Sequence, residues 1–132
     1  MKIAADTNVL VRAITGDNAR QSRIARAELE NAETVVLAVT ALCELVWVLS
    51  QGYKIPAAEI SQAIRRLINA ENVVVNRPAA EAGLDILDAG GDFADGIIAF
   101  EGRWGGADAF VSFDKRAVKI VASSGAAARP LS

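Results

Sequence analysis

Short apolar runs alternate with amphipathic stretches along this chain. Short apolar runs of this length predict strands, and residues 34–39 are in addition rich in β-branched residues, a type of side chain that packs well on a pleated sheet. These runs cover residues 2–5, 34–39, 72–76 and 109–113. Residues 126–131 form either a loose tail or a last edge strand, where Pro130 is tolerated.

The stretches between these runs carry apolar residues at helical spacing. They predict helices over residues 9–14, 18–32, 41–51, 56–68, 78–89, 93–103 and 115–121. Residue types that commonly cap a helix start precede four of these helices. The four are Asp6, Thr40, Asp92 and Asp114.

Strands that alternate with helices predict parallel βαβ units and an α/β fold. We therefore expect a three-layer α/β/α sandwich with a central, mostly parallel sheet, built as one domain over residues 1–132. In such sheets the ligand crevice lies at the carboxyl ends of the strands. Asp6 and Asp114 each follow a predicted strand directly, so both are expected at that edge.

Composition narrows the possible functions. Hydrophobic residues make up 52% of the chain and charged residues 23%, which argues against disorder. No apolar run approaches the roughly 18 to 20 residues that a membrane span requires, and the N-terminus is charged too early for a secretory signal, so we expect a cytoplasmic protein without a membrane partner.

The chain has no histidine, which excludes the usual zinc ligand, the usual general base and Ser-His or Cys-His nucleophile pairs. A net charge of −2 indicates that any nucleic-acid contact depends on local basic patches.

Four carboxylates remain as candidates for chemistry: Asp6, Glu44, Asp95 and Asp114. Helix capping offers a structural explanation for Asp6 and Asp114, and Asp95 fits the third position of a helix that Asp92 caps. Glu44 lies within an apolar helical segment, where we expect no solvent-exposed stripe. A buried carboxylate needs a cation, a hydrogen-bond donor or a cleft, so either an arginine from elsewhere or a metal ion would explain it.

A metal ion would explain all four acids together. Carboxylates that meet at one sheet edge repel each other by about 4 kcal/mol per pair at roughly 4 Å, for an effective dielectric near 20, unless positive charge intervenes. Mg²⁺ or Mn²⁺ suits an all-oxygen site without histidine. Such sites support hydrolysis of phosphodiester bonds, with a water attacking phosphorus in line.

Four segments then resemble, in order and approximate spacing, a PIN-domain ribonuclease of the VapC toxin type. They are Ile3-Ala4-Ala5-Asp6-Thr7-Asn8-Val9-Leu10, the helical Glu44, Asp92-Phe93-Ala94-Asp95-Gly96 and Ser112-Phe113-Asp114-Lys115-Arg116. The resemblance implies a PIN-like fold, RNA as substrate, a homodimer and a cognate antitoxin that blocks the acidic site. It also implies that Asp6, Glu44, Asp95 and Asp114 are the catalytic, metal-binding acids.

Other residues are expected to support this site. Thr7, Asn8, Asp92 and Ser112 flank the acids; Ser112 replaces a common threonine, and Gly96 stands where alanine is common in the resembling family. Cations that could contact RNA phosphates are Arg12, Arg103, Lys115 and Arg116, although each could equally be an ordinary surface residue.

Two other functions place acids at the strand ends of a parallel sheet. A phospho-receiver signalling module requires an acidic pair after the first strand, where this chain has only Asp6. A phosphatase of the haloacid dehalogenase type requires a second aspartate where Asn8 stands.

Overall fold

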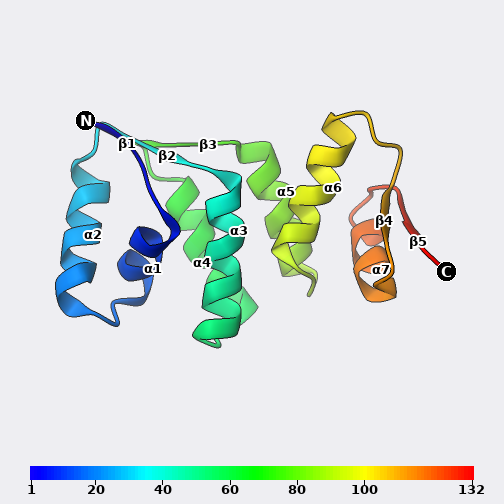
Figure 1. Ribbon diagram of the computed structural model, residues 1–132, viewed down its shortest axis with the longest axis horizontal. Coiled ribbons are helices and arrows are strands. Elements are labelled where there is room, and N and C mark those ends of the chain that lie inside the picture. Colours follow the sequence, from blue (N-terminus) through cyan, green and yellow to red (C-terminus); the bar gives the residue numbers. More distant parts are fainter. The chain divides into compact units, whose positions relative to one another are not determined.

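The computed structural model describes residues 1–132, and the chain divides into two compact units, Met1–Asn76 and Arg77–Ser132. Figure 1 colours the first unit from blue to green and the second from green to red. The elements of the first unit are β1 (Lys2–Ala4), α1 (Thr7–Thr15), α2 (Ala19–Asn31), β2 (Thr34–Leu37), α3 (Val39–Trp47), η1 (Val48–Gly52), α4 (Ala57–Ile68) and β3 (Val73–Val75). Those of the second are α5 (Arg77–Asp88), α6 (Phe93–Trp104), β4 (Phe110–Ser112), α7 (Lys115–Ser123) and β5 (Ala128–Pro130).

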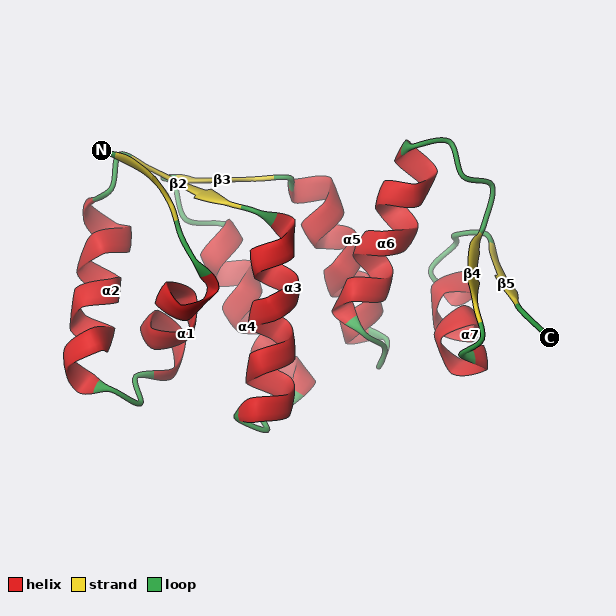
Figure 2. Ribbon diagram, in the orientation of Figure 1, coloured by secondary structure: helices red, strands yellow, loops and turns green.

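The first unit is built on a parallel three-stranded sheet in the order β1-β2-β3. Helices connect β1 to β2 and β2 to β3. Because both connections advance across the sheet in the same direction and such crossovers are right-handed, their helices are expected on the same face of the sheet. Helices α1 to α4 lie on the same side of these strands in Figure 2. The burial of β2 agrees, because Val35 and Leu37 are buried whereas Val36 between them is exposed.

The core of the first unit lies between this sheet face and the apolar stripes of the helices. Leucine and isoleucine side chains from α1, α3, η1 and α4 are fully buried there: Leu10, Leu42, Leu45, Leu49, Ile60 and Ile64. Burial of one such side chain contributes roughly 1.5 to 3 kcal/mol, so the stripes fix how each helix faces the sheet. Their orientation in turn sets where the polar ends of the helices lie.

The single helix predicted over residues 41–51 differs from the structure in two ways. Helix α3 begins at Val39 with Ala38 as its N-cap, so the predicted cap Thr40 lies inside the helix. The helix also changes at Val48 into the π-helix η1, which carries Leu49 into the core. A π-turn adds a residue to the helical repeat, and periodicity in the sequence is too coarse to reveal it.

The second unit combines a helix pair with two parallel strands. Helix α5 packs against α6, and β4 pairs in parallel with β5 through the crossover helix α7. Residues 126–131, for which a tail or an edge strand was predicted, contain the strand β5, and Pro130 occupies its last position. The predicted α/β class with parallel strands is therefore confirmed. None of the helices is long and apolar enough to span a membrane.

Two glycines allow α5 and α6 to approach closely. A Cβ atom on Gly96 would lie 2.3 Å from the carbonyl oxygen of Ala82, and one on Gly83 would lie 2.8 Å from Cε1 of Phe93. Phe93 is fully buried at this crossing. Glycine at position 96 lowers the helix propensity of α6. The close approach of the α5 backbone nevertheless requires a residue without a Cβ atom there.

A polar network in the first unit joins the turn between α1 and α2 to the residue after η1. Arg12 Nη1 donates to Asp17 Oδ1 and Oδ2 at 2.8 and 3.0 Å, and its Nε donates to Gln21 Oε1 at 2.7 Å. The Tyr53 hydroxyl donates to Asp17 Oδ2 at 2.6 Å. The hydrogen bond from Tyr53, together with those from Arg12 and Thr15, lowers the pKa of Asp17 from 3.8 to about 2.

Replacing Asp17 with asparagine is expected to lower the melting temperature at neutral pH and to have less effect in acid. The folded-state pKa of Asp17 is depressed, so its stabilisation is present above 3.8 and is lost as the pH falls through about 2. Thermal unfolding of wild type and Asp17→Asn between pH 7 and pH 2 measures this difference. Equal melting temperatures at pH 7 would show that the network adds no stability.

Candidate metal-binding acidic site

Asp6 lies directly after β1 and caps α1. Its Oδ1 accepts a hydrogen bond from the backbone N–H of Thr7 at 2.8 Å, and its extended backbone is typical of an N-cap. Its Oδ2 makes no hydrogen bond. The cap therefore occupies one carboxylate oxygen and leaves the other open at the end of the strand.

Asp92 and Asp114 follow the same pattern in the second unit. Asp92 Oδ1 accepts from the N–H of Ala94 at 3.1 Å, which starts α6. Asp114 Oδ1 accepts from the N–H groups of Arg116 and Ala117, both at 3.0 Å, which starts α7. The predicted caps Asp6, Asp92 and Asp114 are confirmed, and capping leaves an Oδ2 available on each of them.

Ser112 supports the backbone before Asp114. The N–H of Asp114 donates to Ser112 Oγ at 3.0 Å, so this hydroxyl fixes the turn between β4 and α7. Thr7 is different, because its Oγ1 is buried and has no hydrogen-bond partner. An unsatisfied buried hydroxyl costs about 1 to 3 kcal/mol, so a partner group near the start of α1 would stabilise it. Asn8, the other residue expected to support this end, is exposed.

Asp95 occupies the third position of α6 and lies near two other acids. Partial burial raises its pKa above the ordinary value, and the charges of Asp92 and Asp114 raise it further. The second unit therefore places three carboxylates close enough to disfavour ionisation of one of them. A cation near Asp95 would relieve both causes.

The prediction that Glu44 has no solvent-exposed stripe is wrong. Glu44 is exposed, and so are Thr40 one turn before it and Trp47 one turn after it. Thr40, Glu44 and Trp47 share one face of α3 because they are three and four residues apart. The apolar residues near Glu44 in sequence, Leu42 and Leu45, point into the core from another face.

The four candidate acids share one further property, since none of them makes an ion pair with lysine or arginine. Asp6 and Glu44 lie in the first unit, and Asp95 and Asp114 lie in the second. No group of three or more histidine, cysteine, aspartate or glutamate side chains is arranged to hold a metal ion. Binding of one ion by all four acids thus stays a prediction.

The candidate RNA-binding cations divide into two kinds. Arg12 is held by Asp17, Gln21 and Tyr53, and Arg116 Nη2 donates to the carbonyl oxygen of Gly90 at 2.9 Å. Lys115 and Arg103 are exposed and have no such partner. No local pattern indicates the contact of Arg12 with Tyr53 or that of Arg116 with Gly90, because these partners are remote along the chain.

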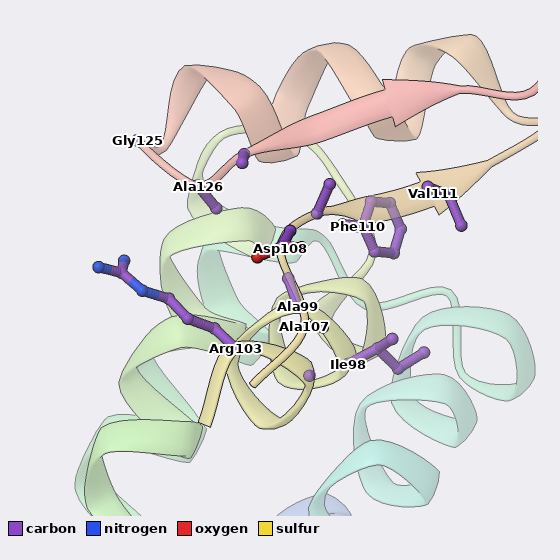
Figure 3. A pocket seen from close by; sticks show the side chains of 12 residues that line it. Ile98, Ala99, Arg103, Ala107, Asp108, Phe110, Val111, Gly125 and Ala126 are labelled. Carbon is purple, nitrogen blue, oxygen red and sulfur yellow. The ribbon is translucent and has the colours of Figure 1, made fainter. Parts of the chain in front are cut away.

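A cavity of about 540 Å³ in the second unit lies between the end of α6 and the beginnings of β4 and β5. Figure 3 shows Arg103 extending from α6 away from Phe110 and Val111, which line another part of this cavity. Asp114 follows the opposite end of β4. The cavity is therefore separate from the acidic cluster of the second unit, by which we mean Asp92, Asp95 and Asp114.

Comparison with known protein families places the chain in a described family. The family model described as PIN domain matches residues 3–122 of the chain. This range includes all four candidate acids and parts of both units. No curated protein matches the sequence.

Proposed function

Because the chain belongs to the PIN domain family, whose members are generally nucleases, we propose that it is an endoribonuclease that depends on Mg²⁺ or Mn²⁺. The observation that supports this proposal best is the placement of Asp95 at the start of α6, partly buried and near Asp92 and Asp114, where burial and these two charges raise its pKa. Carboxylates that crowd together without a lysine or arginine partner are suited to a divalent cation.

The donor chemistry fits such an ion. We propose that Asp6, Glu44, Asp95 and Asp114 hold it, and that the Oδ2 atoms left free by the caps of Asp6 and Asp114 are among the ligands. Each donor is a carboxylate oxygen, which Mg²⁺ and Mn²⁺ prefer. When bound, the cation supplies a water of lowered pKa and neutralises charge on the phosphate.

The chain's own residues would position the substrate. Lys115 follows Asp114 and has no carboxylate partner, so its ammonium group is free to contact an RNA phosphate. Ser112 and the α7 cap hold Asp114 in place next to this lysine. Thr7 would support Asp6 through its backbone N–H, which donates to Asp6 Oδ1 at 2.8 Å in the first turn of α1.

We also propose that the protein is the toxin of a VapBC-type pair, acts as a homodimer in the cytoplasm and is blocked by a cognate antitoxin. This part rests on the order and spacing of the four acidic segments. A neighbouring small reading frame that encodes a DNA-binding protein with an acidic or apolar tail would support the toxin assignment. Its absence would favour a PIN nuclease of another kind.

Removal of divalent cations is expected to abolish RNA cleavage by the purified protein. The reason is that the crowded acids would then lack the charge that the reaction requires. Cleavage of a fluorescent single-stranded RNA is measured with EDTA, and then after addition of Mg²⁺, Mn²⁺ or Ca²⁺. Mg²⁺ or Mn²⁺ should restore cleavage, and undiminished cleavage in EDTA would contradict the proposal.

The family match favours neither of the two other functions. Incubation with acetyl phosphate tests the phospho-receiver alternative, and a chromogenic phosphomonoester tests the phosphatase alternative. Phosphorylation of Asp6 or turnover of the monoester, without RNA cleavage, would replace the nuclease proposal.

A further inference from the structure

Arg116 connects the two segments of the second unit that carry the candidate acids. Its Nη2 donates to the carbonyl oxygen of Gly90 at 2.9 Å, and Gly90 lies in the turn just before Asp92. Its backbone N–H donates to Asp114 Oδ1 at 3.0 Å. One residue therefore contacts both the Asp92–Asp95 side and the Asp114 side of the acidic cluster.

The turn that Arg116 contacts is held by a backbone hydrogen bond and by packing on α7. Gly90 has a φ of +93°, a left-handed conformation that glycine adopts without strain, and the N–H of Gly91 donates to the carbonyl oxygen of Ile86 at 2.8 Å. A Cβ atom on Gly91 would lie 3.1 Å from Cγ2 of Ile120 on α7. The turn thus packs on α7 through Ile120 and is tied to it by the guanidinium of Arg116.

This arrangement changes the role expected for Arg116. A guanidinium that donates to a carbonyl oxygen makes a charge-assisted hydrogen bond, which is stronger than a neutral one. We propose that Arg116 is a positioning residue that fixes the Asp92–Asp95 segment relative to Asp114 and does not bind RNA phosphate. The inference rests on the proposed function, because the spacing of these acids matters for a bound cation.

Three variants separate this role from phosphate binding. Arg116→Ala removes the bond to Gly90, Lys115→Ala removes the adjacent cation that has no carboxylate partner, and Lys119→Ala removes an exposed charge from the same helix as a control. For each full-length protein, the Mn²⁺ affinity is measured by calorimetry, and kcat and KM for single-stranded RNA are measured over a range of salt.

For Arg116→Ala we expect Mn²⁺ binding about 10-fold weaker and a lower kcat, with the salt dependence of KM matching that of Lys119→Ala. Lys115→Ala should instead raise KM. It should also reduce the slope of log KM against the logarithm of the salt concentration by about one, as the loss of a phosphate contact does. An Arg116→Ala protein that behaves like Lys115→Ala, with unchanged Mn²⁺ affinity, would overturn the inference and leave the nuclease proposal intact.

A second measurement does not depend on nuclease activity. In metal-free protein, Arg116→Ala should speed hydrogen exchange at the amides of Gly91 and Ala94 relative to Lys119→Ala, because the turn has lost its tie to α7. If Arg116→Ala fails to fold, Arg116→Lys takes its place, since one ammonium does not reproduce a guanidinium fork. Unchanged exchange in the folded variant would refute the positioning role even if RNA is not the substrate.

Discussion

Replacement of Asp95 by asparagine is expected to reduce RNA cleavage at least about 100-fold, more than the loss of an outer partner of a metal ligand typically causes. The asparagine would keep the shape of the side chain but remove the charge that a cation requires. Helix α6 should still form, because Asp92 provides its cap. Cleavage of single-stranded RNA and circular dichroism, measured on the same preparations, test both parts.

The same variant should be more stable than wild type at neutral pH without metal. The folded-state pKa of Asp95 is raised, so the contribution of this carboxyl to stability is fully present below the ordinary value of 3.8 and is lost as the pH rises through the raised value. The gain from Asp95→Asn should therefore shrink in acid. Addition of Mn²⁺ should raise the melting temperature of the wild type more than that of the variant, because binding to the folded state alone is stabilising.

Asp85→Asn is the matched control for Asp95→Asn. Asp85 is an exposed aspartate on α5, in the same unit, and its side chain makes no ion pair or hydrogen bond. This control should cleave RNA and bind Mn²⁺ as the wild type does. Full activity of Asp95→Asn under the same conditions would remove Asp95 from the site.

Gly96→Ala is expected to destabilise the protein by about 1 to 3 kcal/mol, although alanine is the better helix former. Helix propensity favours alanine by up to about 1 kcal/mol. The added Cβ, however, would lie 2.3 Å from a backbone carbonyl oxygen of Ala82, which a change of rotamer does not relieve. The clash should therefore outweigh the propensity, and urea unfolding measures the difference.

Gly102 offers an internal control on the same helix. A Cβ atom there would meet only Cβ of Ala107, at an ordinary contact distance of 3.7 Å. Gly102→Ala should then be neutral or stabilising by up to about 1 kcal/mol. If both alanine variants are equally stable, the close approach of α5 to α6 does not determine the choice of glycine at position 96.

The sequence predicted those features of the fold that depend on neighbouring residues. The valine run that forms β3 and the caps Asp92 and Asp114 are local signals, and the structure contains the corresponding elements. Short segments in order also indicated the PIN domain family, which the match over residues 3–122 confirms; the VapC toxin type stays a prediction.

Features that depend on distant parts of the chain were not predicted. The exposure of Glu44 depends on which face of α3 turns toward the core, and a nine-residue helix with several apolar neighbours leaves that face ambiguous. The contact between Tyr53 and Asp17 joins residues far apart in sequence. The carbonyl oxygen that excludes a side chain at Gly96 belongs to another helix and has no signature in the local pattern.

Asp6 and Asp114 each cap a helix with only one carboxylate oxygen, and this bears on how readily they could accept an ion. Because Asp6 and Asp114 each anchor one oxygen to the first turn of a helix, their side chains lose rotamer freedom when the chain folds. If a cation binds as proposed, little further ordering of these two groups would accompany its binding, because the folded chain already fixes one oxygen of each carboxylate. Loss of the ion should then be reversible without local unfolding at either helix start.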